Sequence, residues 1–152
     1  MATKLSPHFT LEEMTHSDYA IKHHINNDVN QEQYYALESL CNDILEPIRE
    51  ELGMPIMVSS GFRCLQLNTA INGSKTSQHL NGEAADIHCK DMKKMWNVIT
   101  TMIKDGSIEC GQLIDEFDLQ WIHISLPTRG KVNEVLKATK KNGKTVYSKL
   151  KI

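Results

Sequence analysis

The sequence predicts an α+β domain with an antiparallel sheet and helices packed on one side of it. Helical periodicity dominates the first part of the chain, short β-prone segments follow, and few connections have the length of a βαβ crossover. The chain has 152 residues, of which 40% are hydrophobic, and it contains no repeats or low-complexity linkers. This length suffices for one domain with its own core, so we expect residues 1–152 to form a single domain.

Four helices are predicted from apolar spacing and end signals, over residues 11–14, 31–52, 65–71 and 91–104. Thr10 and Glu13 form a capping-box pattern that opens the first helix. Pro47 lies inside the second and longest helix, where it predicts a kink or a break. Gly53 ends that helix. The polar, turn-rich stretch of residues 17–30 is expected to lack regular structure.

The predicted strands cover residues 55–59, 83–89, 112–117 and 120–125. In the second of these strands, alternation places Asp86 and His88 on one face and the small or apolar residues between them on the other. The dipeptide Asn142-Gly143, between two β-prone segments near the C-terminus, predicts a hairpin. Both tryptophans, Trp96 and Trp121, are interpreted as core residues.

Composition argues against several classes of partner and site. The net charge is −2, which provides no basic field for nucleic acid and no polybasic membrane patch. No apolar run approaches the roughly 20 residues that span a bilayer, and the N-terminus lacks the pattern of a secretory signal. The four cysteines form no CxxC pair, which argues against a thiolate zinc site and a redox motif. We expect a monomer that is made in the cytoplasm without a signal peptide and binds neither nucleic acid nor membrane.

The segment SQHLNGEAAD, at residues 77–86, is the best candidate for chemistry. A catalytic zinc ion takes three protein ligands, drawn from histidine nitrogen and carboxylate oxygen, and keeps one position for water. A loop that turns at Gly82 and enters a strand would bring His79 and Asp86 to one ion. His123 is the best third ligand, because it lies between two isoleucines on a predicted strand. On alternation alone, this histidine could equally face solvent.

Four segments resemble, in order and separation, the motifs of the D-alanyl-D-alanine metallopeptidases. This family includes phage L-alanyl-D-glutamate endopeptidases and the hedgehog signalling domain. The segments are SGFR with LN (60–63 and 67–68), SQHLNGEAAD (77–86), QLIDE (112–116) and WIHIS (121–125). They resemble the family patterns SGYR…LN, SxHxxGxAxD, QLI-x-E and WVHVS. The resemblance runs from about Ser6 to Tyr147 and is closest to the short phage or bacterial branch with QLI-x-E.

The resemblance implies a hedgehog/DD-peptidase-like fold and a site that holds Zn²⁺. The zinc ligands that it implies are His79, Asp86 and His123. Arg63 matches a loop arginine that binds substrate or stabilises the oxyanion, a role that suits a fixed guanidinium. Ser77 and Gln78 are candidates for substrate contact, although both could simply cap the turn.

The general base is the residue that the resemblance assigns least directly. Several relatives have an acidic residue three positions before the last histidine ligand, but this chain has Gln120 there, which cannot accept a proton usefully. Glu116 matches the acidic residue of the QLI-x-E pattern and could reach the metal across a tight turn. Asp118 and Asp115 are the alternative bases.

The implied activity is zinc-dependent hydrolysis of a peptide bond in peptidoglycan stem peptides, by an endopeptidase or a DD-carboxypeptidase. A phage or prophage endolysin fits this activity, and it would act on the cell wall after release by a holin or by lysis. Two alternatives stay open. Gln120 favours a non-catalytic zinc-containing binding module, as hedgehog domains illustrate. The same fold could also serve as a wall-degrading component of a virion.

Overall fold

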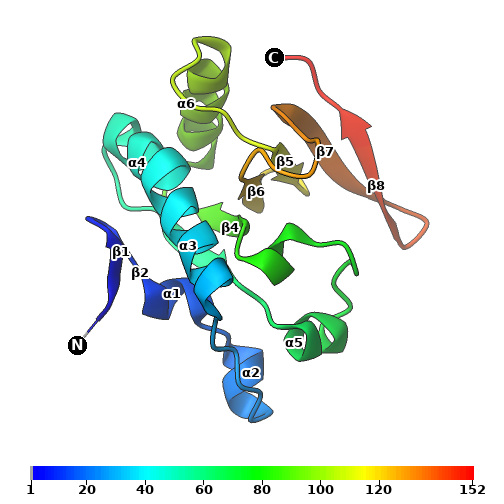
Figure 1. Cartoon of the computed structure of the whole chain (residues 1–152). Coiled ribbons are helices and arrows are strands. Elements are labelled where there is room, and N and C mark those ends of the chain that lie inside the picture. The colour runs from blue at the N-terminus through cyan, green and yellow to red at the C-terminus, as the bar shows by residue number, and fades with distance from the viewer. Residues whose placement is uncertain (1) are drawn as a thin grey trace.

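The computed structural model describes residues 2–152 and confirms the α+β fold class (Figure 1). The helices are α1 (Leu11–Thr15), α2 (Asp18–Lys22), α3 (Gln31–Leu40), η1 (Cys41–Leu45), α4 (Glu46–Leu52), α5 (Leu65–Ala70), η2 (Gln78–Asn81) and α6 (Met92–Lys104). The strands are β1 (Lys4–Ser6), β2 (Phe9–Thr10), β3 (Met57–Ser60), β4 (Ala84–His88), β5 (Gln112–Glu116), β6 (Trp121–Ser125), β7 (Glu134–Lys141) and β8 (Lys144–Lys149). No helix of the described chain is long and apolar enough to cross a membrane.

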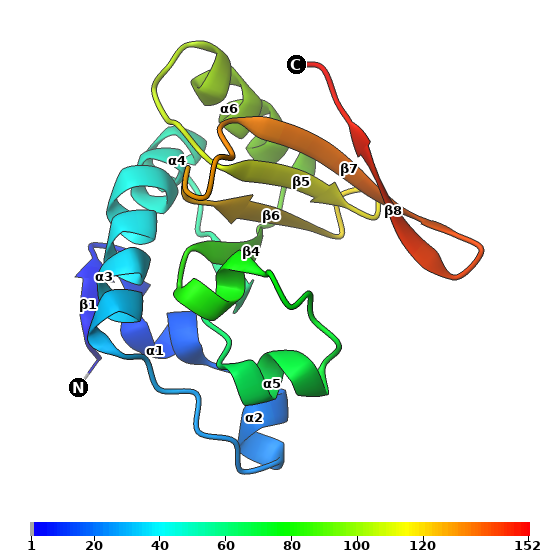
Figure 2. The same cartoon turned by 45° about the vertical axis from the view of Figure 1, so that its right-hand side comes forward.

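The central element is a six-stranded sheet with the order β3-β4-β6-β5-β7-β8 (Figure 2). All neighbouring strands are antiparallel except β5 and β7, which are parallel, so the sheet is mixed rather than wholly antiparallel. The parallel pair arises because the chain turns back after β6 and places β7 one strand further on, beside β5. Strands β1 and β2 form a separate two-stranded sheet.

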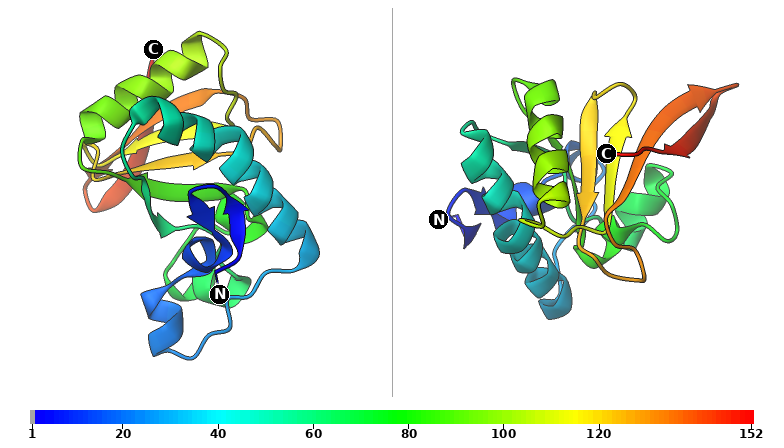
Figure 3. Two further views of the ribbon diagram at one scale, coloured as in Figure 1. Left: turned by 90° about the vertical axis from the view of Figure 1, so that its left-hand side faces the viewer. Right: turned by 90° about the horizontal axis from the view of Figure 1, so that it is seen from above.

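The two faces of the six-stranded sheet have different surroundings. One face is covered by α3, α4 and α6, as the end-on view of Figure 3 shows. Apolar residues of the strands alternate toward this side, and Leu113, Ile122 and Ile124 are fully buried in the core. The opposite face carries Asp86 and His123, and its apolar cover is limited to a small cluster around Ile114. The sheet therefore separates the core from a polar surface.

The long predicted helix is continuous but changes its winding before Pro47. Residues Cys41–Leu45 form one π-helical turn between α3 and α4, and the Glu46 N–H bonds to the carbonyl of Cys41. Pro47 lacks an N–H and its ring collides with the preceding turn, so a locally wider turn accommodates it without a break. Gly53 ends α4 with a φ of 70°, as expected.

The C-terminal strands confirm the predicted hairpin. Asn142 and Gly143 form its two-residue turn with φ values of 53° and 76°. Two consecutive positive φ angles are characteristic of a type I′ turn, which matches the twist of the flanking strands. Every residue of β8 is exposed, and the hairpin extends away from the helices (Figures 2 and 3). The stretch of residues 17–30, in contrast, contains the short helix α2, which its polar composition did not predict.

Candidate functional site

Three candidate ligands converge on the open face of the sheet. Asp86 of β4 and His123 of β6 are directly paired across the two strands, so both side chains leave the same face. His79 reaches them from the short helix η2, which precedes β4. One ligand atom from each residue lies within 4.8 Å of those of the other two. His79 is 2% exposed, and the side chains of Asp86 and His123 are 16% and 12% exposed.

The turn that carries His79 is fixed at both ends. Ser77 caps η2, and its Oγ accepts a hydrogen bond from the backbone N–H of His79. Gly82 ends the turn with a φ of 71°, which an L side chain rarely adopts. A Cβ on Gly82 would also lie 2.6 Å from the carbonyl oxygen of Gln33 in α3. The glycine therefore allows both the turn and its close contact with the helix.

The hydrogen bonds of His79 define which of its nitrogens faces the site. Its Nδ1 lies 2.6 Å from the carbonyl oxygen of Gly61. A carbonyl only accepts hydrogen bonds, so Nδ1 carries the hydrogen and donates it. Nε2 is then the nitrogen that faces Asp86, in the arrangement that orients many metal-binding histidines.

The separations between the ligand atoms fit a shared zinc ion. His79 Nε2 and His123 Nδ1 lie 3.3 Å and 3.2 Å from the same oxygen, Oδ1 of Asp86. Four ligands at about 2.0–2.1 Å from a tetrahedral zinc ion would be about 3.3 Å apart. Two imidazole nitrogens and one carboxylate oxygen also match the ligand types of catalytic zinc sites. The three residues could therefore hold the ion and leave its fourth position open.

The same residues keep Asp86 ionised. Burial opposes the charge of its carboxylate, but His79 and His123 outweigh this effect through their charges and hydrogen bonds. The net result is a pKa of Asp86 well below the usual range of an aspartate. Because a metal ligand must be deprotonated, the environment favours the form of Asp86 that binds a cation.

Glu116 is an acidic residue of β5 on the same face of the sheet as His123, and the strand pairing places it close to that histidine. Ile114 of β5 pairs with His123, and Glu116 lies two residues further along, opposite Trp121. A diagonal pair of this kind is about 7–8 Å apart, which leaves space for a water molecule between the side chains. Glu116 is 8% exposed. Burial raises its pKa, the charges of Asp86 and Asp115 add to this, and His123 acts against it.

An unusual turn joins Glu116 to β6. Phe117, Asp118 and Leu119 all have positive φ values, of 55°, 58° and 60°. Each such non-glycine residue costs about 1–2 kcal/mol, so the surrounding contacts must hold the turn. The N–H of Gln120 donates to the carbonyl of Glu116 at 3.0 Å and closes the turn. The turn therefore fixes the backbone of Glu116 and brings Gln120 to the pocket.

The structure places the two alternative bases away from the ligands. The side chain of Asp118 is 86% exposed and forms an ion pair with Lys137 at 2.9 Å. Asp115 leaves the opposite face of β5 and accepts a hydrogen bond from the N–H of Leu119 at 2.7 Å. Of the three carboxylates considered for the base, Glu116 is the one that lines the pocket with the ligands.

Arg63 lies beside the ligands on a loop that several hydrogen bonds hold. Its guanidinium donates to Ser77 Oγ at 3.3 Å, and its backbone N–H donates to the carbonyl of His79 at 3.0 Å. Asn27 binds both neighbours of Arg63: its amide donates to the carbonyl of Phe62 and accepts from the N–H of Cys64. The sequence did not identify Asn27, because a single asparagine in a polar stretch has no periodic signal.

The side chain of Gln78 is buried and takes part in structural hydrogen bonds. It is 5% exposed, and its amide donates to the carbonyl of Leu126 and to Thr128 Oγ1. These bonds connect the η2 turn to the segment after β6. Ser77 likewise caps the turn and also orients Arg63. Both residues line the pocket, so capping and substrate contact do not exclude each other.

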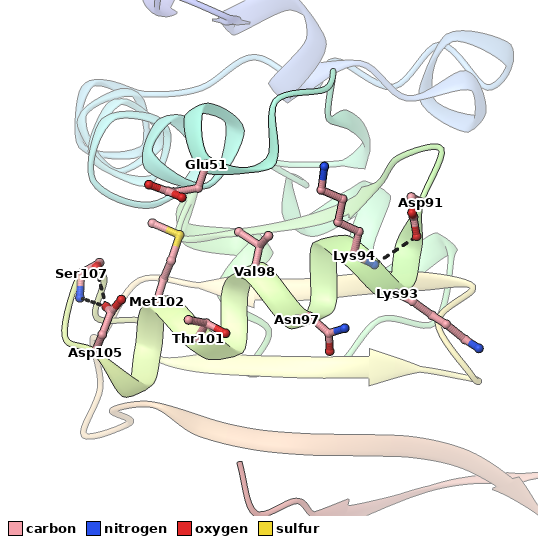
Figure 4. A pocket seen from close by; sticks show the side chains of 10 residues that line it. All are labelled: Glu51, Asp91, Lys93, Lys94, Asn97, Val98, Thr101, Met102, Asp105 and Ser107. Carbon is pink, nitrogen blue, oxygen red and sulfur yellow. Dashed lines mark hydrogen bonds between the residues drawn. The ribbon is translucent and has the colours of Figure 1, made fainter.

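The ligands lie in a pocket of about 960 Å³. Its lining includes residues of the 71–77 loop and of the β7–β8 hairpin. Trp121 also lines the pocket and makes an edge-to-face contact with Phe117, so its interpretation as a core residue was wrong. A second hollow lies between α4 and α6, where Val98 and Met102 face Glu51 (Figure 4). It contains none of the ligand residues.

Comparison with known protein families supports the interpretation of this site. Residues 7–125 match the model of the family described as Peptidase M15, which covers well over half of the chain. The matched region contains all four sequence motifs and the His-Asp-His group. No curated protein gives a significant match to the chain. The chain belongs to the peptidase M15 family of zinc-dependent metallopeptidases.

Proposed function

We propose that this protein hydrolyses a peptide bond in peptidoglycan stem peptides, as an endopeptidase or a DD-carboxypeptidase. The supporting observation is that one pocket holds three metal-ligand side chains, a buried carboxylate and an arginine. These five residues are His79, Asp86, His123, Glu116 and Arg63. Such a combination suits metal-assisted hydrolysis of an amide. The protein would reach the wall of its target after release by a holin or by lysis.

The proposed mechanism assigns a separate task to each group. A zinc ion, when bound, would polarise the scissile carbonyl and lower the pKa of water. Glu116 would accept the proton of the attacking water and transfer it to the leaving amine. Burial raises the pKa of Glu116, which brings its proton affinity closer to that needed for both transfers. Arg63, oriented by Ser77, would donate hydrogen bonds to the developing oxyanion.

A second candidate is a binding module that holds zinc without hydrolysis. Gln120 favours this alternative, because it lines the pocket at a position where several relatives have an acidic residue. The position of Glu116 favours catalysis, because its carboxylate shares the pocket with the candidate ligands and forms no ion pair with a lysine or arginine of residues 2–152. The two candidates make different predictions for turnover but the same prediction for zinc content.

The deciding experiment combines zinc analysis with a hydrolysis assay. Purified protein is analysed for bound zinc and incubated with peptidoglycan of several chemotypes, and released amino groups are quantified with and without a chelator. One zinc per chain and release that stops with the chelator and returns with added zinc would support the enzyme. Mass spectrometry of the fragments would then identify the bond. Bound zinc without release would favour the binding module, and failure to bind zinc would contradict both.

A further inference from the structure

The net charge of −2 hides a strongly uneven distribution along the chain. Residues 131–152 contain seven of the 17 basic residues and one of the 19 acidic residues, so their net charge is +6 while that of residues 1–130 is −8. The basic segment forms the β7–β8 hairpin and its flanks. It also lies beyond residue 125, where the match to the peptidase family ends. The role of this segment must therefore follow from its own residues.

The basic hairpin borders the pocket that contains the candidate ligands. Lys140, Thr145 and Tyr147 line that pocket together with Arg63. The ammonium group of Lys140 lies 5.7 Å from the centre of the Phe117 ring, which also lines the pocket. This contact holds the charge near the pocket rim. Partial burial and the charges of Glu116 and Asp86 raise the pKa of Tyr147, so its phenol stays a hydrogen-bond donor.

The register of the hairpin divides its lysines between two faces. Lys140 pairs with Thr145 across the strands, and both residues line the pocket. Lys141 pairs with Lys144, so alternation directs these two side chains to the opposite face. Lys140 and Lys141 are therefore adjacent, equally charged and both exposed, and they differ in the face that they occupy.

We propose that the β7–β8 hairpin is a substrate-binding wall that recognises a carboxylate of an anionic peptide. Lys140 supplies the charge and Tyr147 the hydroxyl donor. Glu116 lines the same pocket, is not one of the candidate metal ligands and would repel an anionic substrate, so a cation on the hairpin improves complementarity. The assignment rests on the proposed hydrolysis of stem peptides, which carry several free carboxylates. It adds a substrate contact that the family-matched region does not contain.

The experiment compares Lys140→Glu with the matched control Lys141→Glu. Both variants change the net charge equally, at exposed neighbouring positions where folding is retained, as circular dichroism checks. The probes are a synthetic stem pentapeptide with free carboxylates and the same peptide with its carboxylates amidated. For the free peptide we expect the KM of Lys140→Glu to exceed that of Lys141→Glu by about tenfold, since two charges change at the contact. For the amidated peptide the two variants are expected to agree within about twofold.

Calorimetric binding of both peptides to the zinc-loaded full chain separates this inference from the proposed function. If the wild-type protein binds the free peptide without cleaving it, the proposed hydrolytic function is contradicted, but the role of the hairpin in binding can still be tested. The wall is then supported if Lys140→Glu alone weakens binding of the free peptide. The substrate-binding role of the hairpin would be contradicted, even in an active enzyme, if the two variants changed KM or affinity equally. Equal changes for the free and the amidated peptide would contradict it too. A wild-type protein that binds neither peptide would overturn both.

Discussion

The two faces of the central sheet share the same strands but differ in what their side chains do. Toward the helices, Leu113, Ile122 and Ile124 are fully buried and support folding. Toward the pocket, His123 of the same strand β6 and Asp86 of the neighbouring strand β4 form side-chain contacts with each other and with His79. Because side chains alternate along a strand, a residue that stabilises the core can be the direct neighbour of one that belongs to the candidate site. Substitutions on the two faces should have correspondingly different effects.

The largest expected effect is the loss of metal and activity in His123→Ala. This change removes one of three ligands from a partly exposed position, so the fold should survive while zinc content falls well below one per chain and hydrolysis stops. His88→Ala is the matched control. His88 is another partly buried histidine on the same face of β4 as Asp86, but it is not part of the His-Asp-His group. Full zinc occupancy in His123→Ala would contradict the ligand assignment.

The next largest effect is expected in Glu116→Gln. This substitution keeps the shape of the side chain and removes the proton acceptor, so kcat should fall by about 10²–10⁴-fold with zinc content unchanged. Asp118→Asn is the control, because it removes a nearby charge that points to solvent and pairs with Lys137. We expect near-normal turnover in the control. If Asp118→Asn were the inactive variant and Glu116→Gln the active one, the base would have to be reassigned.

The core face should show the opposite behaviour. Leu113→Ala deletes a fully buried side chain on the helix side of β5, so the free energy of unfolding should fall by about 2–5 kcal/mol. Turnover per folded molecule should be unchanged at temperatures below the unfolding transition. Urea unfolding and kcat are the two measurements, and Thr145→Ala, at an exposed position on the pocket side, is the control with a change below about 0.5 kcal/mol. Loss of turnover in folded Leu113→Ala would show that the two faces are coupled.

The sequence predicted these two faces unequally. Apolar patterning was sufficient for strands β3 to β6 and for the long helix, because burial acts on every second or every third to fourth residue. It did not indicate the short strands β1 and β2. Spacing suggested that His79, Asp86 and His123 could meet, but a polar side chain on a strand can equally face solvent. The resemblance of four motifs to a family was needed to choose between these alternatives. The specific phage or bacterial branch of that family stays a prediction.

The contacts that position the site could not be predicted from the sequence, because they join residues that are far apart along the chain or form turns without a recognisable pattern. Asn27 holds the Arg63 loop through bonds to residues about 35 positions away, and such pairings leave no local pattern. The left-handed turn at Phe117–Leu119 contains no glycine, so turn chemistry did not reveal it. The pocket wall at Lys140 depends on the parallel pairing of β5 with β7, which places the hairpin beside the ligands. Sequence spacing does not report such long-range pairing.

The smallest expected effect tests a region outside both faces, where His8 and Ser6 contact Glu46 of α4. Partial burial opposes ionisation of Glu46. Hydrogen bonds from His8 and Ser6 outweigh it, so the pKa of Glu46 lies below its ordinary value of 4.5. A carboxylate with a lowered folded-state pKa stabilises the protein above its unfolded-state pKa, and this contribution is lost as pH falls through the folded-state value.

Glu46→Gln should therefore lower the free energy of unfolding by about 1 kcal/mol at pH 7 and weaken its dependence on pH below about 4.5. Urea unfolding between pH 3 and pH 7 measures both changes, and Glu50→Gln, at an exposed position of the same helix, is the control. The pH profile of hydrolysis should be the same in Glu46→Gln and in the wild type, because Glu46 lies outside the pocket. A shifted activity profile would mean that the core beneath α4 transmits charge effects through the sheet, and the separation of the two faces would then be incomplete.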